Sequence, residues 1–363
     1  MADSTRTAIY LSRNGPVVKD ISEQYRPTGT QSLLRVEYSG INPADIKHAG
    51  LGLHSSVAGY DMSGEVLETG PDSPFQPGDK VFGINSAGPN RPLYMGAHQD
   101  YAIAANNFWY RIPSPGTLSL CRAATLPVMT LTAADGLFNL LGLGFPAAGV
   151  AGCESQPLLI WGGASTVGLA AIQLAKAAGH GPIFATASVK NHETLKSLGA
   201  SYCFDYKDDN VVEQIRLAIR TINRKSVRYA FDTVGGGIFP MGGDFKKSSP
   251  ALTEASISLD GQQDQDVKLA CTIPVGGHPR YKMCFATRDA NSPMEMGRAD
   301  DPEAWHEMQS RVMSWVLANF GEGQYVSCPN IRVVKGAKAC LEAMGQSAAG
   351  KGSLEKIAVE HPL

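Results

Sequence analysis

The sequence predicts an α/β protein with two domains, a small β-barrel and a doubly wound parallel sheet. The chain has 363 residues, 43% of them hydrophobic, and this is enough for more than one core because domains average about 150 residues. Short strand-like runs joined by Gly and Pro turns dominate the first part of the chain, which indicates a barrel. Strand and helix patterns alternate from residue 158 onward, which is typical of a parallel sheet.

The barrel is expected from four strand-like runs, residues 31–39, 58–69, 78–83 and 100–105. The pattern becomes helical from Thr125 to Leu141. The long Gly, Ala and Pro segment 142–156 that follows is expected to form an edge feature or a lid. Two further strand-like segments, 331–336 and 353–360, end the chain.

Residues 158–180 have the pattern of a buried strand, a glycine turn and an apolar helix. The glycines of Gly162-x-x-Ser165-x-x-Gly168 allow a close approach of the backbone to a pyrophosphate. The N–H groups at the start of the helix attract the same anion. We therefore expect a dinucleotide site formed by Ala164, Ser165, Thr166 and Val167. Such a turn is also compatible with a purely structural role.

The segment after the second strand, residues 181–187, decides the type of cofactor. NAD sites place an acidic residue about 20 residues after the glycine turn to bind the ribose 2′-hydroxyl. Here Ser188, Val189, Lys190 and Asn191 occupy this place, and no acid occurs before Glu193. A hydroxyl, an ammonium and an amide suit a 2′-phosphate, so NADPH is the expected cofactor, with Tyr206 as a further donor. Alternatively, Lys190 and Asn191 only solvate the start of a helix.

Composition excludes several other classes of protein. The net charge of −2 without a basic cluster argues against binding of nucleic acid or of an anionic membrane. No apolar run approaches the ~20 residues that span a bilayer, and the N-terminus lacks a signal-peptide core, so a cytoplasmic protein is expected. The seven cysteines are scattered without a CxxC pair, which argues against a disulfide framework and a Cys-rich zinc lobe.

Several segments together resemble the landmarks of the medium-chain dehydrogenase/reductase superfamily, in its quinone-oxidoreductase and enoyl-reductase branch. They are INPADIKHAG (41–50), AGYDMSGEV (58–66), PGDKVFG (77–83), LPVMTLTAADGL (126–137), WGGASTVGLAAIQLAKAAG (161–179) and LKSLGASYCFDYKD (195–208). Within that branch the chain most resembles fungal trans-acting enoyl reductases of polyketide synthases. The resemblance implies a GroES-like catalytic domain, residues 1–125 and 320–363, and a Rossmann NADPH-binding domain, residues 126–319.

The resemblance also implies hydride transfer without zinc. Zinc-dependent members carry a Cys and a Gly-His-Glu motif, whereas this chain has Ala44-Asp45-Ile46-Lys47 and Gly59-Tyr60-Asp61. No metal is therefore expected, and the lone His48 and His54 are expected to be exposed side chains. Lys47 is the candidate cation for enolate charge, with the alternative of an ordinary surface lysine. Contacts to the cofactor are implied for Ala44, Asp45, Ile46, Lys47, Val333 and Val334.

Thr132 matches a family position near the nicotinamide ribose and the reacting centre, although its hydroxyl equally suits a bond to a helix carbonyl. The stretch that follows resembles the lining of an acyl pocket: Ala133, Ala134, Asp135, Gly136, Leu137, Phe138, Asn139 and Leu140. A core helix would have the same pattern. The far side of that pocket is assigned by analogy to Cys284, Phe285, Ala286, Thr287 and Arg288. Residues 233–261 depart from the family pattern, and a regular helix over 233–249 is not expected because of the prolines and glycines.

The resulting expectation is a monomeric, NADPH-dependent enoyl reductase. Its substrate would be an α,β-unsaturated thioester on the carrier protein of a highly reducing polyketide synthase, or of a synthase–peptide synthetase hybrid. One alternative is a stand-alone, zinc-independent reductase of diffusible quinones or enones. Another is a non-catalytic NADPH-binding protein, against which the presence of both Lys47 and Thr132 argues.

Overall fold

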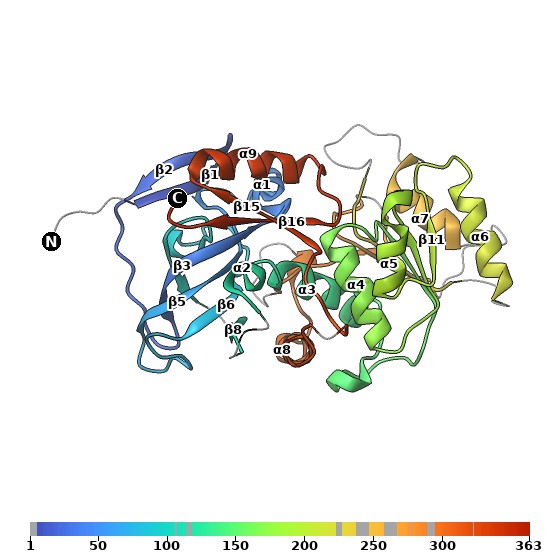
Figure 1. The fold of residues 1–363 in the computed structure, drawn as a ribbon, viewed down its shortest axis with the longest axis horizontal. Helices are drawn as coiled ribbons and strands as arrows, with labels where there is room; N and C mark the ends of the chain where they lie inside the picture. Colours follow the sequence, from blue (N-terminus) through green and yellow to red (C-terminus); the bar gives the residue numbers. More distant parts are fainter. Residues whose placement is uncertain are drawn as a thin grey trace. The chain divides into compact units, whose positions relative to one another are not determined.

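The computed structural model divides the chain into two compact units, shown together in Figure 1. Unit 1 comprises Met1–Val128 and Ser327–Leu363, and unit 2 comprises Met129–Val326. The divisions expected from the sequence, after residues 125 and 319, lie slightly earlier in the chain at both places. The structure describes residues 6–105, 107–113, 116, 118–222, 227–236, 247–257, 267–276, 278–288, 295–321 and 323–363.

Unit 1 consists mainly of antiparallel strands. Its larger sheet has the order β15-β16-β3-β5-β6-β8, with β7 paired to β3. A smaller sheet has the order β2-β1-β4. The bounds are β1 Arg6–Ser12, β2 Gly15–Ile21, β3 Ser32–Ile41, β4 Ser56–Val57, β5 Asp61–Thr69, β6 Lys80–Ile84, β7 Tyr101–Ala104, β8 Trp109–Arg111, β15 Asn330–Lys335 and β16 Glu355–Glu360. The sheets therefore contain each strand-like run that the sequence predicted for this part.

The C-terminal segment completes unit 1, as its position beside the first strands in Figure 1 shows. Strand β16 pairs antiparallel with β3, with Val359 opposite Ser39. The helix α9, Ala337–Ala348, buries Cys340 and Met344 in the same core as Ile9 of β1. Two short helices, α1 (Ala44–Lys47) and α2 (Leu120–Ala123), complete the unit's α-helices among the described residues.

Unit 2 is built around a six-stranded parallel sheet of order β11-β10-β9-β12-β13-β14. The strands are β9 Leu158–Trp161, β10 Ile183–Thr186, β11 Tyr202–Phe204, β12 Tyr229–Asp232, β13 Lys268–Cys271 and β14 Tyr281–Met283. Counted within the sheet, this is the order 3-2-1-4-5-6 of a doubly wound Rossmann domain. The predicted fold class is thus confirmed.

The helices of unit 2 connect and cover this sheet. They are α3 Pro127–Ala134, which starts two residues before the unit, α4 Thr166–Ala177, α5 His192–Leu198, α6 Val211–Thr221, α7 Ser249–Ile257 and α8 Pro302–Ala318. On α6, Val211, Ile215 and Ile219 are buried at a spacing of four residues, which places them on one face. Their burial with Leu159 and Phe184 of the sheet forms the main described core of the unit.

The segment 142–156 is packed rather than lid-like, which corrects the expectation of a lid. Leu143 and Phe145 are fully buried, and the Phe145 ring contacts the rings of Phe138 and Trp315 with centroids 5.3 and 4.9 Å apart. The Gly149 carbonyl also accepts a hydrogen bond of 2.8 Å from Arg311 of α8. Opening this segment would expose two large apolar side chains, so it is a fixed part of the unit.

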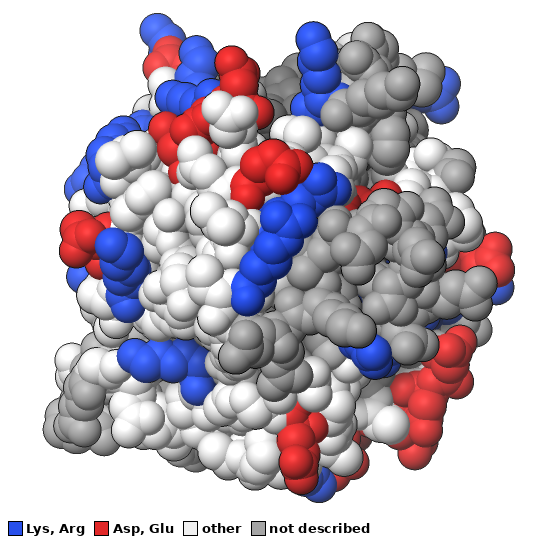
Figure 2. Space-filling view, turned by 90° about the vertical axis from the view of Figure 1, so that its right-hand side faces the viewer, with Lys and Arg blue, Asp and Glu red and all other residues white. Residues whose placement is uncertain are grey.

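The irregular region after β12 is described in part. Residues 233–236 form a turn and α7 begins at Ser249, while residues 237–246 and 258–261 of the predicted departure lie outside the described residues. In the described part of the chain, no helix is long and apolar enough to cross a membrane. On the face in Figure 2, described Lys and Arg side chains are interspersed with Asp and Glu.

Candidate functional site

The glycine turn between β9 and α4 forms an anion site at the N-terminus of a helix. Ser165 is the N-cap residue of α4, and its hydroxyl accepts the N–H of Gly168 at 2.9 Å. The N–H groups of Thr166 and Val167 precede the first intrahelical donor, the N–H of Leu169, which bonds the Ser165 carbonyl at 2.8 Å. They therefore stay available for a ligand. Because the helix is 12 residues long, its dipole adds a positive partial charge at the same point.

Two glycines of this turn are required by its geometry. Gly162 has φ +84°, a left-handed conformation that favours glycine. A Cβ atom on Gly168 would lie 2.3 Å from the carbonyl oxygen of Gly162, so a side chain would push the helix away from the turn. The turn therefore fits the close backbone approach that a dinucleotide pyrophosphate needs.

Thr233, which the sequence analysis did not single out, links this turn to the other half of the sheet. Its hydroxyl lies 2.8 Å from that of Ser165 and 2.9 Å from the carbonyl oxygen of Gly162. Strand β9 lies between β10 on one side and β12 on the other, so the order of the strands reverses at this point. Ligands of doubly wound sheets bind at such a switch point. The position of Thr233 directly after a parallel strand is the signal that would have identified it.

Most of the residues predicted to bind the 2′-phosphate lie just beyond the end of β10. Val189, Lys190 and Tyr206 are exposed and Ser188 is partly exposed, so these residues can reach a ligand from the solvent side. No Asp or Glu occurs from Ala187 to His192. Asn191 is 4% exposed, which leaves its amide little access to a nucleotide and corrects the expectation for this residue.

Lys47 is the last residue of α1 in unit 1. Burial lowers the pKa of its ammonium group. Within the described part of the chain, its Nζ atom makes no hydrogen bond or ion pair. A partly desolvated cation without an acidic partner is suited to meet negative charge that develops on a ligand.

The three residues before Lys47 are placed differently from one another. Ala44 is partly exposed, and Ile46 packs against the core that contains Ile9. Asp45 is 1% exposed, and its Oδ2 atom accepts the N–H of Asn42 at 2.7 Å and faces His98 Nε2 at 3.2 Å. The Asp45 carboxylate is therefore directed into unit 1, and a contact of this residue with a cofactor remains a prediction.

His48 and His54 are partly buried and hydrogen-bonded, which corrects the expectation of exposed side chains. His48 Nδ1 lies 2.7 Å from the Tyr60 hydroxyl, and His54 Nδ1 lies 2.9 Å from that of Ser55. Burial lowers the pKa of His48 to about 4 and raises that of Tyr60 to about 12, so both stay neutral at physiological pH. No group of three His, Cys, Asp or Glu side chains among the described residues could hold a metal ion.

The other predicted contact residues lie in both units. Val333 and Val334 belong to β15 of unit 1, and Val333 is exposed while Val334 packs against the core. Thr132 lies in α3 and is 8% exposed. Its hydroxyl has no hydrogen-bond partner within the described residues, and the alternative of a bond back to a helix carbonyl is thus not observed there. The roles of these residues in binding remain predictions.

The predicted acyl-pocket residues include a buried ion pair. Arg288 donates to both carboxylate oxygens of Asp135, at 2.8 Å and 2.7 Å. The same carboxylate accepts the Trp305 indole N–H and the Phe285 backbone N–H, each at 2.8 Å. The Asp135 side chain is 0% exposed and that of Arg288 is 4% exposed. Asp135 and Arg288 are therefore occupied with each other, and their assignment to the lining of an acyl pocket remains a prediction.

The remaining members of this set divide into core and surface residues. Asp135–Leu140 form a single π-helical turn after α3, a feature frequent at functional sites. The buried members are Ala133, Ala134, Gly136, Leu137, Phe138, Cys284 and Phe285, whereas Ala286 and Thr287 are partly exposed. Asn139 and Leu140 line a cavity of about 550 Å³ in unit 2. Its wall combines apolar side chains, such as Ile273 and Met296, with the charged Lys282, Arg288, Arg298 and Asp300. The cavity wall is therefore mixed in polarity, and a role as an acyl pocket remains a prediction.

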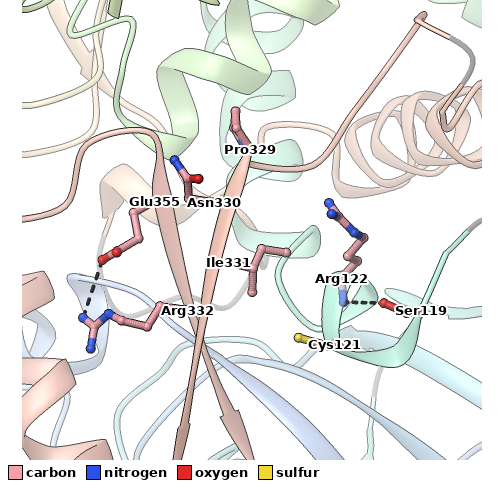
Figure 3. Close-up of a pocket in the computed structure, with 8 residues that line it drawn as sticks. All are labelled: Ser119, Cys121, Arg122, Pro329, Asn330, Ile331, Arg332 and Glu355. Atoms are coloured by element: carbon pink, nitrogen blue, oxygen red, sulfur yellow. Dashed lines mark hydrogen bonds and ion pairs between the residues drawn. The ribbon is translucent and has the colours of Figure 1, made fainter. Parts of the chain in front are cut away.

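A second cavity, of about 420 Å³, lies within unit 1 (Figure 3). Its wall includes Cys121, Arg122 and Arg332. Arg122 donates to the Ser327 hydroxyl at 2.5 Å, and Arg332 donates to Gln346 at 2.8 Å and pairs with Glu355, the contact dashed in Figure 3. Both guanidinium groups thus have protein partners, and burial raises the pKa of the Cys121 thiol, so the cavity offers no activated group.

Comparisons with known proteins agree with this architecture. Residues 28–114 match the family described as alcohol dehydrogenase GroES-like domain, and residues 166–242 match the family described as zinc-binding dehydrogenase. The chain belongs to the medium-chain dehydrogenase/reductase superfamily. Unit 1 is its GroES-like domain and unit 2 is its Rossmann domain.

Among curated members of the superfamily, a trans-enoyl reductase of Fusarium heterosporum is 33% identical over 64% of this chain and 65% of its own length. The match thus spans less than two thirds of that relative. A trans-enoyl reductase of Aspergillus flavipes is 28% identical over 94% of this chain and 95% of its own length.

Solved structures of the superfamily share the fold over the full chain. The CurK enoyl reductase has 19% identity and a TM-score of 0.69, with 99% of this chain and 100% of that chain covered. A mycobacterial protein, Rv1454c, crystallised with NADPH, has 20% identity and a TM-score of 0.67, with 98% and 100% covered. At these identities the likeness shows the fold alone.

Proposed function

We propose that this protein is an NADPH-dependent, zinc-independent enoyl reductase. Its substrate would be an α,β-unsaturated thioester carried by a highly reducing polyketide synthase, on which it acts in trans. The observation that carries the proposal is the cofactor turn, where an anion-binding helix N-terminus and the acid-free exposed segment after β10 occur together. The relatives named as trans-enoyl reductases support the choice of substrate class.

The choice of NADPH rests on electrostatics at the end of β10. A carboxylate there would repel a 2′-phosphate, whereas the Lys190 ammonium and the Ser188 and Tyr206 hydroxyls attract it. Lys190, Tyr206 and Val189 are exposed, so the phosphate can be bound without moving the sheet. The pyrophosphate would be held by the N–H groups that follow Ser165.

The chemistry needs a cofactor that supplies a hydride to the β-carbon of the thioester. Negative charge then develops on the thioester oxygen, and the protein must stabilise it. Lys47 is the proposed cation because its ammonium group is partly desolvated and has no acidic partner among the described residues. The Thr132 hydroxyl, which has no hydrogen-bond partner in the described part of the chain, is the proposed hydrogen-bond donor contributed by unit 2.

The test is a steady-state assay of NADPH oxidation by the purified full-length chain. An enoyl-pantetheine thioester should be reduced with a kcat/KM at least tenfold above that for simple quinones. Equal or faster reduction of quinones would instead identify a stand-alone quinone or enone reductase. A protein that binds NADPH but reduces neither class would be a non-catalytic NADPH-binding protein.

A further inference from the structure

A chain of four hydrogen bonds crosses the interior of unit 1 between two carboxylates. Asp45 Oδ2 lies 3.2 Å from His98 Nε2, and His98 Nδ1 lies 2.9 Å from the Ser39 hydroxyl. Ser39 also lies 2.9 Å from His361 Nε2, and His361 Nδ1 lies 3.1 Å from Asp100 Oδ1. The side chains of His98, Asp45 and His361 are at most 1% exposed, whereas that of Asp100 is 20% exposed, so water reaches this chain only at Asp100.

Both ends of this chain are fixed as hydrogen-bond acceptors. Asp45 Oδ2 also accepts the backbone N–H of Asn42 at 2.7 Å, and Asp100 Oδ1 also accepts the backbone N–H of Leu363 at 2.9 Å. An oxygen that already faces an N–H donor is suited to remain a bare acceptor. The three groups between the carboxylates must then supply the protons of all four bonds.

The proton count leaves this chain one proton short. Ser39 has one hydroxyl proton, and each neutral imidazole of His98 and His361 has one N–H. These are three protons for four bonds. If Ser39 donates to one histidine, it accepts from the other, and that histidine must donate on both sides. We infer that the folded protein holds one extra proton in the Asp45–His98–Ser39–His361–Asp100 chain, and that this proton ties α1 to the C-terminal residues.

Burial disfavours a second proton on His361, one of the two histidines of this chain. Burial of His361 lowers its pKa, although the neighbouring Asp100 raises it. A neutral His361 donates from Nδ1 to Asp100 and accepts from Ser39. Ser39 then accepts from His98 Nδ1, and the extra proton lies between His98 Nε2 and Asp45. Other ionisable groups that act on Asp45 or on its partner Asn42 are His48, Tyr60, Asp61, Arg91, Cys340 and Lys356.

The extra proton bears on function because Asp45 and Lys47 belong to the same short helix. Without the proton, Asp45 Oδ2 and His98 Nε2 would be two facing acceptors, and α1 would lose its bond to His98. His98, Ser39 and His361 are thus positioning residues for the Lys47 ammonium. This functional part rests on the proposed role of Lys47, whereas the proton count does not.

The test compares the wild type with Ser39→Ala. Removal of the hydroxyl leaves two separate His–carboxylate bonds, which two neutral histidines satisfy without an extra proton. The wild-type fold should therefore bind one proton more than the variant above the ordinary histidine pKa of about 6.5. Because the extra proton binds to the folded wild type with a raised pKa, it stabilises the wild type at low pH. This stabilisation is lost as pH rises.

Urea unfolding at pH 6.5–8.5 measures this difference. The ratio of the wild-type to the Ser39→Ala unfolding constant should rise with pH by up to about tenfold per unit, which corresponds to one proton. Ser39→Thr keeps the hydroxyl and should behave like the wild type. A ratio that stays constant with pH would overturn the inference.

A second measurement needs no variant that must fold. Nitrogen and carboxyl-carbon NMR of the labelled wild-type chain at pH 7.5 should show either His98 protonated on both nitrogens or Asp45 protonated. Neutral His98 and His361 together with ionised Asp45 and Asp100 would overturn the proton count. If both measurements support it, Ser39→Ala should also lower kcat with NADPH affinity nearly unchanged, and a protein without any reductase activity would refute only the proposed function.

Discussion

Replacement of Asp135 by alanine should destabilise unit 2 more than any surface change. The carboxylate accepts two hydrogen bonds from Arg288, one from Trp305, one from the Phe285 backbone and one from Asn139. Alanine would leave a guanidinium group that is 4% exposed without its counter-ion. Breaking a buried pair in this way costs about 3–5 kcal/mol. The several N–H donors that lose their acceptor place the expected loss in this range rather than below it.

Urea unfolding followed by tryptophan fluorescence is the suitable assay, because Trp161, Trp305 and Trp315 lie in unit 2 and Trp109 in unit 1. Lys196→Ala is the matched control, since it removes an exposed ion pair with Glu193 in the same unit and should cost about 0–1 kcal/mol. The double variant Asp135→Leu/Arg288→Met should lose less than Asp135→Ala because it leaves no unpaired buried charge. A loss below about 1 kcal/mol for Asp135→Ala, or a larger loss for the double variant, would refute the reasoning.

Four further predictions concern the cofactor, the catalytic cation, the metal and pH. Lys190→Ala should remove about 1–3 kcal/mol of the preference for NADPH over NADH, measured by fluorescence titration, and equal wild-type affinities would contradict it. Lys47→Ala should lower kcat on an enoyl thioester by about 10- to 1000-fold and change NADPH affinity much less, whereas an unchanged kcat would make the lysine structural. The purified protein should lack stoichiometric zinc by elemental analysis and keep its activity in a strong chelator; one zinc per chain would reopen a metal-dependent reaction. The folded state lowers the pKa of His48 from 6.5 to about 4, so the free energy of unfolding falls as pH falls through this interval. In acid unfolding, His48→Gln should therefore lose less of this free energy than the wild type. An equal loss would contradict the burial argument.

The doubly wound fold class was predictable because its signals are local. Each strand of unit 2 is a short apolar run, and Gly162 and Gly168 mark the turn that a dinucleotide fold requires. The acid-free segment after β10 could likewise be located by counting residues from the glycine turn. These features depend on neighbours in the sequence, which periodicity and turn chemistry describe.

The side-chain partners were not predictable because they join residues far apart in the chain. The sequence motif around Asp135 looks like a small-residue helix, and only its distant partner Arg288 shows that the carboxylate is occupied. In the same way, Ser39 pairs with a histidine 322 positions away. A lone buried acid near a motif is therefore weak evidence for a ligand contact until its partner is known.

The two buried acids, Asp45 and Asp135, have the same physical role, one in each unit. Both carboxylates are buried and accept backbone N–H groups and side-chain donors. Asp45 therefore fixes α1, which carries Lys47. Asp135 fixes the π-helical turn that follows the helix of Thr132. Lys47 and Thr132 themselves have no partner among the described residues. Each unit thus leaves its proposed reactive side chain unpaired while a buried carboxylate fixes the element beside it, so a ligand need not displace a protein partner at either position.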